Sequence, residues 1–429
     1  MPGENNSNII LGAGLAGLGA AYYSGFPVYE QGARAGGVAD SVCKGGFVFD
    51  FGIHVLHSND MRFHDLLKEV GLELVDHERR AYIYSYGSYT CYPFQVNSSH
   101  LPLMLRIRCV FDFLTRRANS LPADYEQWMI HNFGEGFART FLIPYAEKFW
   151  RVLPKNMTYD WTNARVPQPS TVEVIKGAFL DTPSELGPNA RFRYPSKDGA
   201  GFAGLAQALA SRIDNIRCGM KATAVDIQNK KVIFNGDGEV VSYDNLITTI
   251  PLPELIGLIP DVPSEIRQTA TRLKCNSIAI INFGVDSPDI TDKHWIHFPE
   301  KDISFFRISF PDNFCPGLRP DGTSSIQAEV SYDKDSPPDT DELLTNVHND
   351  LLKVGVLNAR HRVGFQDVIY LKYAYVVYDH DRKDNVAQIH EYLNKHNVYP
   401  CGRYGAWEYQ WSDEAILSGM ETAKKLLRP

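Results

Sequence analysis

The spacing of hydrophobic and polar positions changes several times along the chain, and each change marks a predicted element. Residues 7–30 hold a short apolar run, a glycine-rich turn, an apolar helical stretch and a second apolar run, which predicts a strand, a helix and a strand. The region from about 103 to 150 has the three- to four-residue spacing of helices. Short β runs are predicted at 222–227, 231–234 and 245–249, and alternating strands at 277–285, 303–310 and 324–331.

The last predicted element is a helix over residues 412–427, with Ser412 or Asp413 as its N-terminal cap and basic residues at its end. The segment 318–340 is rich in Pro, Gly, Asp and Ser and is predicted to contain surface loops. The order of the patterns predicts an α/β fold in which a Rossmann-like domain is interleaved with an α+β substrate domain, built from a helical segment and a largely antiparallel sheet. The expected ranges are 1–85, 190–260 and 390–429 for the first domain, and 86–189 and 261–389 for the second.

Composition and charge narrow the class of protein. The formal net charge of −8 argues against nucleic acid as a partner, although a few converging arginines would still bind an anionic small molecule. No stretch approaches the roughly 20 apolar residues that cross a bilayer, and the N-terminus lacks the basic start of a signal peptide, so we expect a cytoplasmic protein. The seven cysteines are scattered and never spaced CxxC, which predicts reduced thiols and no metal site.

The first β–helix turn carries the fingerprint of a dinucleotide site. Gly12, Gly14 and Gly17 form GxGxxG between an apolar strand and a helix, and Glu30 ends the following strand. The glycines permit a tight turn, a close approach to a pyrophosphate and close packing of helix on strand, while an acid at position 30 accepts hydrogen bonds from ribose hydroxyls. The alternative is a glycine-rich turn without a ligand.

Two further segments resemble a superfamily of flavoproteins. Ala33-Arg34-Ala35-Gly36-Gly37 and Cys401-Gly402-Arg403-Tyr404-Gly405 are similar to the second glycine-rich segment and the C-terminal segment of amine oxidases, protoporphyrinogen oxidases and UDP-galactopyranose mutases. This resemblance implies FAD as the cofactor, with the start of the final helix directed at the flavin. The residues expected to bind FAD are Gly12, Gly14, Ala16, Gly17, Glu30, Gln31, Gly36, Gly37, His54, Ala224, Gly402, Arg403, Tyr409, Ser412 and Asp413.

Within that superfamily the chain most resembles the eukaryotic-type UDP-galactopyranose mutases. The motifs that carry the resemblance are spread over nearly the whole length. They are Asp50-Phe51-Gly52-Ile53-His54-Val55, Tyr92-Pro93-Phe94-Gln95-Val96-Asn97, the stretch from Pro144 through Trp150 to Asn163-Ala164-Arg165-Val166, Gly187-Pro188-Asn189-Ala190-Arg191-Phe192-Arg193-Tyr194-Pro195, Phe298-Pro299-Glu300 with Phe306-Arg307, Tyr375, and Arg403 to Tyr409.

The mutase resemblance implies that a nucleoside-diphosphate sugar is converted between its pyranose and furanose forms, with N5 of the reduced flavin as the nucleophile at the anomeric carbon. The implied catalytic residues are His54, Arg165, Arg307, Tyr375 and Tyr409. The implied substrate-binding residues are Tyr92, Phe94, Gln95, Asn97, Arg165, Asn189, His297, Arg307, Tyr375 and Tyr409. NAD(P)H is a candidate reductant, although the sequence has no second dinucleotide fingerprint.

Three departures from the mutase pattern and two other functions stay open. His297 and Phe314 stand where the family has tyrosines, and Ile53 replaces a glycine beside the flavin. The alternatives are an FAD-dependent oxidoreductase of the amine oxidase or protoporphyrinogen oxidase type, and a flavin-binding protein without catalysis. The arginines would then be surface residues, and the tyrosines and His54 core residues. The nucleotide, the sugar and the oligomeric state, a homo-oligomer included, are left open.

Overall fold

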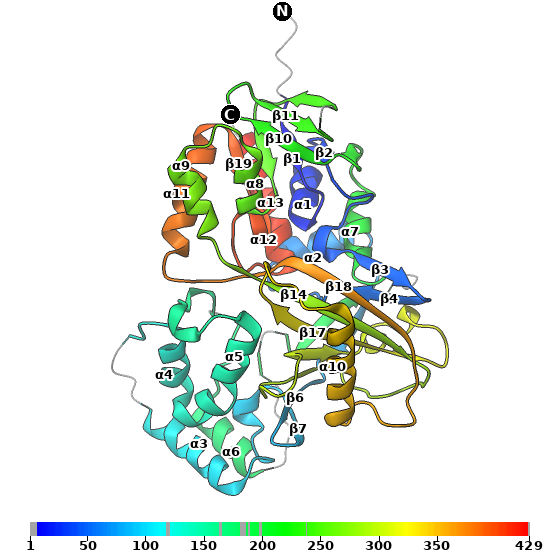
Figure 1. Cartoon of the computed structure of the whole chain (residues 1–429), viewed down its shortest axis with the longest axis vertical. Helices are drawn as coiled ribbons and strands as arrows, with labels where there is room; N and C mark the ends of the chain where they lie inside the picture. The colour runs from blue at the N-terminus through cyan, green and yellow to red at the C-terminus, as the bar shows by residue number, and fades with distance from the viewer. Residues whose placement is uncertain are drawn as a thin grey trace, which may run out of the picture.

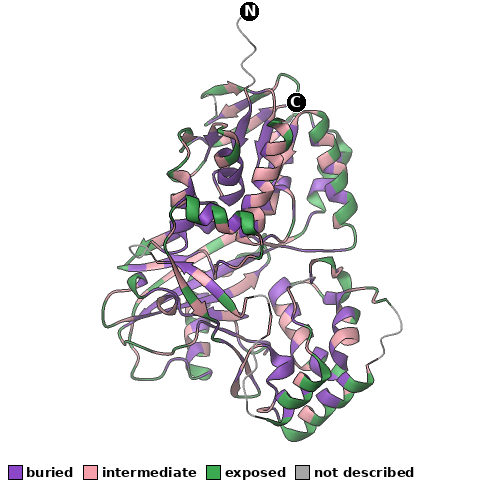
Figure 2. Ribbon diagram, turned by 180° about the vertical axis from the view of Figure 1, so that it is seen from behind, coloured by how far each residue is buried: buried purple, intermediate pink, exposed green. Residues whose placement is uncertain are grey.

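A computed structural model of the chain describes residues 7–116, 121–162, 165–180, 186–187, 189–196, 200–236 and 238–427. The fold has an upper part with a parallel sheet, a central mixed sheet, and a lobe of helices at the lower left of Figure 1. Buried positions follow the inner faces of both sheets and the inner sides of the helices, as Figure 2 shows. No helix in the described part of the chain is long and apolar enough to cross a bilayer.

The upper part is built on a five-stranded parallel sheet with helices against it. The strand order is β19-β13-β1-β2-β9, so three chain segments far apart in sequence meet in one sheet. The helix α1 (Leu15–Ser24) connects β1 to its parallel neighbour β2, which makes the predicted βαβ unit. The strands are β1 (Ile9–Leu11), β2 (Val28–Tyr29), β9 (Ile216–Arg217), β13 (Leu246–Thr248) and β19 (Val398–Pro400).

The helices of this upper part are mostly apolar on the side that faces the sheet. The final helix, α13 (Ser412–Leu427), has the predicted bounds and packs along α1. Gly19 and Gly419 allow this approach, because a Cβ at either position would collide with a backbone carbonyl of the other helix. The remaining helices and strands of the upper part are α2 (Met61–Glu69), α7 (Ala203–Ala210), α8 (Leu252–Leu258), α9 (Ser264–Thr271), α11 (Arg382–Lys395), α12 (Gly402–Gly405), β10 (Ala222–Asp226), β11 (Lys231–Phe234) and β12 (Val240–Ser242).

The central sheet has seven strands in the order β18-β14-β17-β16-β15-β6-β7. All its neighbours are antiparallel except β6 and β15, so the sheet is mixed. The helix α10 (Thr340–Lys353) runs beside it (Figure 1). The strands are β6 (Ala81–Ser85), β7 (Ser88–Cys91), β14 (Cys275–Val285), β15 (Trp295–His297), β16 (Arg307–Ser309), β17 (Ser324–Tyr332) and β18 (Val363–Val376).

The predicted strand over 303–310 is shorter in the structure, where only Arg307–Ser309 pair as β16. The backbone N–H of Ser304 donates to the carboxylate of Asp350 at 2.6 Å, so the preceding residues follow a loop anchored on α10. Two short antiparallel ribbons complete the β structure: β3 (Ser41–Lys44) with β4 (Phe47–Asp50), and β5 (Leu74–Glu78) with β8 (Arg191–Pro195).

The helical lobe confirms the helical prediction for 103–150, with a break after the first helix. Its aromatic core is formed by residues such as Phe133, Phe137 and Phe141. The elements are α3 (Leu103–Thr115), α4 (Tyr125–Phe137), a π-helical turn (Ala138–Leu142), α5 (Ile143–Trp150) and α6 (Thr171–Phe179). The division into two domains stays a prediction; β6, which lies in the predicted first range, belongs to the central sheet.

Candidate functional site

The turn between β1 and α1 forms a cradle that would accept a pyrophosphate. Gly12 has φ +95°, and a Cβ at Gly17 would collide with the carbonyl oxygen of Gly12. The helix begins at Gly14 without a side-chain cap and without an acid in its first turn, so its free N–H groups are left for an anion. Gly36 and Gly37 lie directly against Gly14, which closes the cradle from the other side.

Glu30 lies beneath this cradle and is buried. Its two carboxylate oxygens accept hydrogen bonds from the backbone N–H groups of Ala13 and Gly32, both at 2.7 Å. Each oxygen keeps a further lone pair for a ribose hydroxyl. Among the other expected FAD ligands, Ala16 packs under Gly402, Gln31 is exposed beside the cradle, and Ala224 lies at a register shift in β10. The residues present therefore fit a dinucleotide.

The C-terminal segment brings a buried guanidinium to the far end of the cradle. Arg403, on α12, lies against the rings of both Tyr375 and Tyr409, 4.9 Å from the centre of each. Its Nε and Nη2 are sealed from solvent and have no hydrogen-bond partner among the described residues. Asp413, at the start of α13, has an Oδ1 that is likewise buried and has no hydrogen-bond partner among the described residues. Unpartnered buried polar atoms at this point indicate that a polar ligand completes the site.

His54 lies on the loop that follows β4, and its ring stacks on Phe202 with centroids 4.9 Å apart. The loop is fixed by the buried Asp50, which accepts from Ser41 Oγ and Tyr194 OH at 2.6 Å each. Burial, helped by the nearby charge of Arg403, lowers the pKa of His54 to about 4. His54 is therefore a neutral ring with an unpartnered Nδ1.

Arg307 and Tyr375, two of the predicted catalytic residues, meet in the central sheet. Arg307 donates from Nη2 to the hydroxyl of Tyr375 at 3.1 Å and to the carboxylate of Glu329 at 2.7 Å. Glu329 is 1% exposed and also accepts from the backbone N–H of Ile53 at 3.2 Å. Burial raises the pKa of Tyr375 to about 12, so its hydroxyl stays protonated and able to donate.

Arg165 contacts Tyr409, the second of the two tyrosines that lie against Arg403. Its Nη2 donates to the carbonyl of Tyr409 at 2.8 Å and to Glu414 at 2.6 Å, and its guanidinium lies 4.8 Å from the ring centre of Trp411. Its Nε is buried and unpartnered among the described residues. Three guanidiniums, of Arg165, Arg307 and Arg403, thus contact one pair of tyrosines.

His297 is the departure from the family pattern that lies in this site. It is the register partner of Arg307 across β15 and β16, and its Nδ1 is 2.8 Å from the hydroxyl of Tyr145. Burial lowers the pKa of His297 and raises that of Tyr145, so the phenol donates to a neutral ring. The ring of Tyr92 lies 5.5 Å from the ring of His297, centroid to centroid.

The structure places several other predicted residues away from this group. Phe94 is fully buried in the helical lobe, where it stacks on Phe141 at 4.9 Å. Phe314 packs in the apolar core, stacked on Tyr194 and on His294. Gln95 and Asn97 are buried, and Asn97 donates to the carbonyl of Pro93 at 3.0 Å. Ser412 starts α13. Asn163, Ala164 and Pro188 lie outside the described residues.

Glu329, Tyr145 and Arg79 are the site residues that the sequence did not single out. Glu329 is an acid in a strand whose first six residues are all buried in the structure, but the alternating sequence around it contains no signal of that burial. Arg79 is 1% exposed, donates to Asn189 Oδ1 at 2.7 Å and lies over the ring of Tyr92. Through these contacts and a hydrogen bond to the carbonyl of Leu186, it holds Leu186 and Asn189 beside Tyr92.

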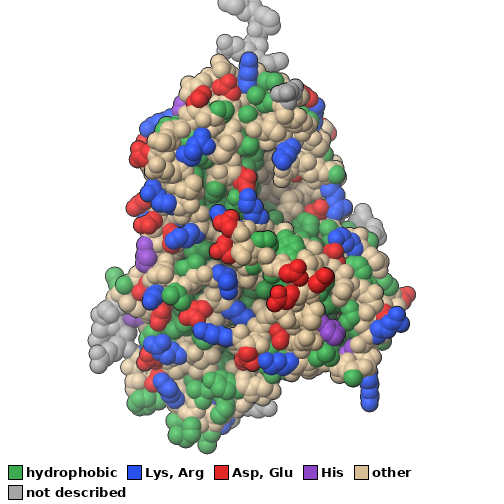
Figure 3. Space-filling model, in the orientation of Figure 1, with side chains coloured by type: hydrophobic (Ala, Val, Ile, Leu, Met, Phe, Trp, Pro, Cys, Tyr) green, Lys and Arg blue, Asp and Glu red, His purple; other side chains and the backbone are tan. Residues whose placement is uncertain are grey.

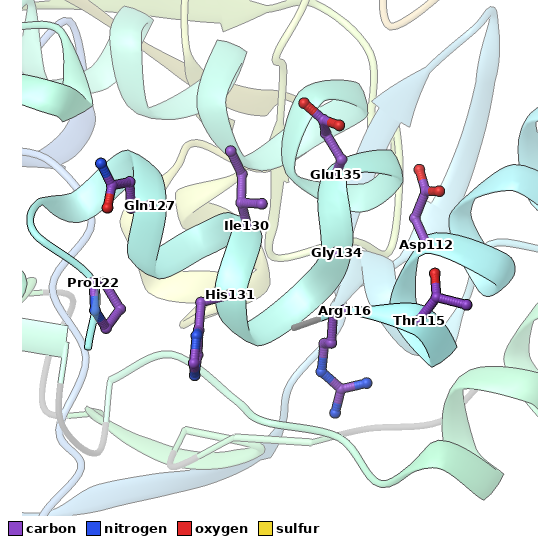
Figure 4. A pocket seen from close by; sticks show the side chains of 9 residues that line it. All are labelled: Asp112, Thr115, Arg116, Pro122, Gln127, Ile130, His131, Gly134 and Glu135. Carbon is purple, nitrogen blue, oxygen red and sulfur yellow. The ribbon is translucent and has the colours of Figure 1, made fainter. Parts of the chain in front are cut away.

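Two surface hollows lie elsewhere and contain none of the predicted site residues. The first, of about 350 Å³, lies in the helical lobe, and Figure 4 shows its side chains: Asp112, Thr115, Arg116, Pro122, Gln127, Ile130, His131, Gly134 and Glu135. The second, of about 500 Å³, lies on the β5–β8 ribbon. Across the described ranges, no group of three His, Cys, Asp or Glu side chains is placed to hold a metal ion.

Comparison with known proteins agrees with this geometry. A solved structure of reduced UDP-galactopyranose mutase matches with 27% identity and a TM-score of 0.92, covering 99% of this chain and 94% of the other. A putrescine oxidase matches with 15% identity and a TM-score of 0.67, covering 98% and 99%. A CLA-producing fatty acid isomerase from P. acnes matches with 13% identity and a TM-score of 0.68, covering 100% of both chains. The last two show the fold alone.

The family model described as flavin containing amine oxidoreductase matches residues 25–427, nearly the whole chain. With the cradle at Gly12–Gly17 and the acid at Glu30, this assigns the cofactor as FAD. The chain is a member of the flavin-containing amine oxidoreductase family.

Proposed function

We propose that this protein is an FAD-dependent nucleotide-sugar mutase that interconverts the pyranose and furanose forms of its substrate, as eukaryotic-type UDP-galactopyranose mutases do. The observation that carries the proposal is the convergence of Arg165, Arg307 and Arg403 on Tyr375 and Tyr409. The carboxylates of Glu329 and Glu414 pair with Arg307 and Arg165, whereas Arg403 forms no ion pair among the described residues, so its charge is available to an anion. A diphosphate is an anion that such a group would bind.

The chain's own residues would perform three tasks. The arginines would bind and stabilise the nucleoside diphosphate as it leaves, and the hydroxyls of Tyr375 and Tyr409 would donate to its oxygens. His54, a neutral ring beside Arg403, would contact the flavin without adding charge. Bound FAD in its reduced form would supply the nucleophilic N5 for the anomeric carbon. NAD(P)H would serve as the reductant.

A cation of the protein already contacts the aromatic rings that would attract an amine substrate. Aromatic rings attract ligand cations, but the rings of Tyr375 and Tyr409, which meet edge to face with centroids 5.7 Å apart, each lie 4.9 Å from the guanidinium of Arg403. This arrangement favours the mutase over the oxidation of an amine. An FAD-dependent oxidoreductase is the alternative, and it would need no paired arginines.

The test is nucleotide binding by the FAD-loaded protein. UDP, GDP and dTDP would each be titrated while flavin absorbance and melting temperature are followed. We expect one of them to bind, and Arg165→Ala or Arg307→Ala to weaken binding at least about 30-fold, since removing one partner of a desolvated charge costs about 2–5 kcal/mol. Arg362→Ala, at an exposed ion pair with Asp286, is the matched control and should bind as the wild type does.

Activity distinguishes the two functions. With a panel of nucleotide sugars, furanose products should form only after reduction by dithionite or NAD(P)H. Equal activity with oxidised flavin would exclude the mutase. Oxygen consumption with amines, together with indifference to every nucleotide, would favour the oxidoreductase.

A further inference from the structure

Lys148, near the end of α5, is a lysine whose ammonium binds the main chain inside the protein. Figure 3 shows the more usual arrangement, in which Lys and Arg side chains stand at the surface among Asp and Glu. Lys148 is instead half-buried, and it donates to the backbone carbonyls of Phe298 at 3.1 Å and of Glu300 at 2.8 Å. A charge is costly to remove from water unless it is hydrogen-bonded. These two bonds therefore fix the carbonyls against α5.

The two carbonyls belong to the loop 298–306, which joins His297 at the end of β15 to Arg307 at the start of β16. The second half of the loop is held by α10, where Asp350 accepts a backbone N–H of the loop at 2.6 Å. Lys148 holds the first half, directly after His297. A shift of this half would therefore be passed to the two side chains at the ends of the loop.

Three side chains on one side of α5 contact the candidate site or this loop. Tyr145 hydrogen-bonds Nδ1 of His297 at 2.8 Å, and Phe149 packs on the ring of Tyr375 with centroids 4.4 Å apart. Lys148 lies between them in sequence, and side chains three or four positions apart share one side of a helix. The helix α5 thus supports the histidine, the tyrosine and the loop, and Lys148 provides its contact with the loop.

We infer that Lys148 is a positioning residue for diphosphate binding: by holding the loop 298–306 on α5, it fixes where His297 and Arg307 lie. The inference rests on the proposed function, in which Arg307 binds the diphosphate. Lys148 acts through the loop and needs no contact with the substrate. Because a charged donor makes a stronger hydrogen bond than a neutral one, the anchor depends on the charge of Lys148.

The charge of Lys148 changes close to neutral pH. Burial lowers its pKa to about 7, although the carboxylates of Glu300, Asp350 and Asp302 act in the opposite direction. Burial also raises the pKa of Glu300, whose Oε1 accepts from the backbone N–H of Tyr86 at 3.3 Å. The other charged groups at the loop are paired: Lys301 with Glu147, and Lys353 with Asp302. The ammonium is charged below about pH 7 and loses its proton above it, so the anchor should weaken as the pH rises.

The first measurement is the affinity of the FAD-loaded full chain for UDP, GDP and dTDP between pH 6 and pH 8.5. Lys148→Met keeps the length of the side chain but removes its charge and its donors. Because misplacing a binding group by about 1 Å can cost roughly 100-fold, we expect this variant to raise the dissociation constant at least about tenfold at pH 6. The ratio of the variant to the wild type should shrink by pH 8.5, where the wild-type lysine is largely neutral.

Lys353→Met is the matched control, because Lys353 also contacts the loop, through Asp302, but is 50% exposed. It should bind the nucleotide as the wild type does throughout this pH range. A ratio for Lys148→Met that stays constant with pH would show that Lys148 only fills space, and would overturn the inference.

The second measurement needs no nucleotide. Amide hydrogen exchange of the FAD-loaded chain, corrected for the intrinsic effect of pH, should be at least about fivefold faster across 298–307 in Lys148→Met than in the wild type, and unchanged in β14. Equal exchange in both proteins, or faster exchange in β14 as well, would overturn the inference. A wild type that binds none of the three nucleotides would instead refute the proposed function, and the exchange would still decide whether Lys148 anchors the loop.

Discussion

Arg307 and Glu329 form a buried ion pair in which Nη2 of the arginine lies 2.7 Å from Oε2 and 2.9 Å from Oε1 of the glutamate. The glutamate also accepts from the backbone N–H of Ile53, so it connects the central sheet to the loop that carries His54. Ile53, which replaces the glycine of the mutase pattern, makes this contact through its backbone N–H and not through its side chain. The loss of a glycine there therefore leaves the contact between sheet and loop in place.

Replacing Glu329 by glutamine should destabilise the protein. The change keeps a hydrogen-bond acceptor but leaves the buried charge of Arg307 without its counter-ion, which costs about 3–5 kcal/mol. Chemical denaturation of the FAD-free protein would measure this loss in the free energy of unfolding. Glu254→Gln is the control: its ion pair with Lys372 is exposed, so the expected loss is about 1 kcal/mol or less. Equal losses for both variants would contradict the prediction.

Gly14 and Gly17 should respond differently to alanine. Gly14 has φ −71°, and its nearest neighbour to an added Cβ is Gly37 Cα at 4.0 Å, so Gly14→Ala should fold normally. The new methyl would stand where the pyrophosphate approaches, and we expect the dissociation constant for FAD to rise at least about tenfold. Gly17→Ala should instead lower the melting temperature of the FAD-free protein.

Gly257→Ala provides the control for this pair, because a Cβ there meets nothing within 4 Å. It should leave FAD binding unchanged and should not lower the melting temperature, since alanine is favoured over glycine inside α8. If Gly14→Ala takes up FAD as tightly as the wild type, the cradle is not the pyrophosphate site.

Stability should fall as the pH drops from about 6.5 to about 4. The folded pKa of His54 is about 4, below its usual 6.5, so within this window the unfolded chain binds a proton that the folded chain does not. The free energy of unfolding therefore decreases as the solution is acidified. His54→Gln removes this contribution and should flatten the dependence of the melting temperature on pH. His380→Gln, at an exposed position, is the control and should leave the slope unchanged.

Tyr145→Phe should affect stability and substrate affinity together. It removes the donor to Nδ1 of His297 and leaves that nitrogen unsatisfied, at a cost of about 1–3 kcal/mol. Freed from its partner, the ring would lose its fixed tautomer, and we expect the KM of the proposed substrate to rise more than kcat falls. Tyr89→Phe also removes a hydroxyl donor, to the carbonyl of Val354, but lies outside the site. A similar loss of stability with unchanged KM is expected there.

Local patterns predicted the parts of the fold that depend on neighbours in sequence. The β1–α1–β2 unit and the final helix have a strong spacing signal, and both are confirmed. The strand at 303–310 was predicted too long because its first half is held by Asp350, a residue distant in sequence. The spacing of apolar residues carries no information about a hydrogen bond to a residue that is distant in sequence.

In the site, too, local motifs predicted some residues, whereas others depend on tertiary contacts. Motif resemblance named both Arg307 and Tyr375 as catalytic candidates, and the structure places them in contact, while their catalytic role stays a prediction. Phe94 lies in a motif assigned to the substrate, yet its ring belongs to the aromatic core of the lobe. Glu329 was overlooked because an acid in an alternating strand is normally a solvent-facing position, and only the pairing of β17 between two other strands makes it internal.

The glycine-mediated contact of α1 with α13 also bears on biogenesis. At roughly 5–20 residues per second, the roughly 390 residues that separate α1 from α13 take about 20–80 s to translate, so the partner of the first helix emerges long after it. During that interval α1 and its phosphate cradle lack the surface that covers them. We therefore expect flavin capture to be a late event in synthesis, and a chain that ends before residue 412 to retain its coenzyme poorly.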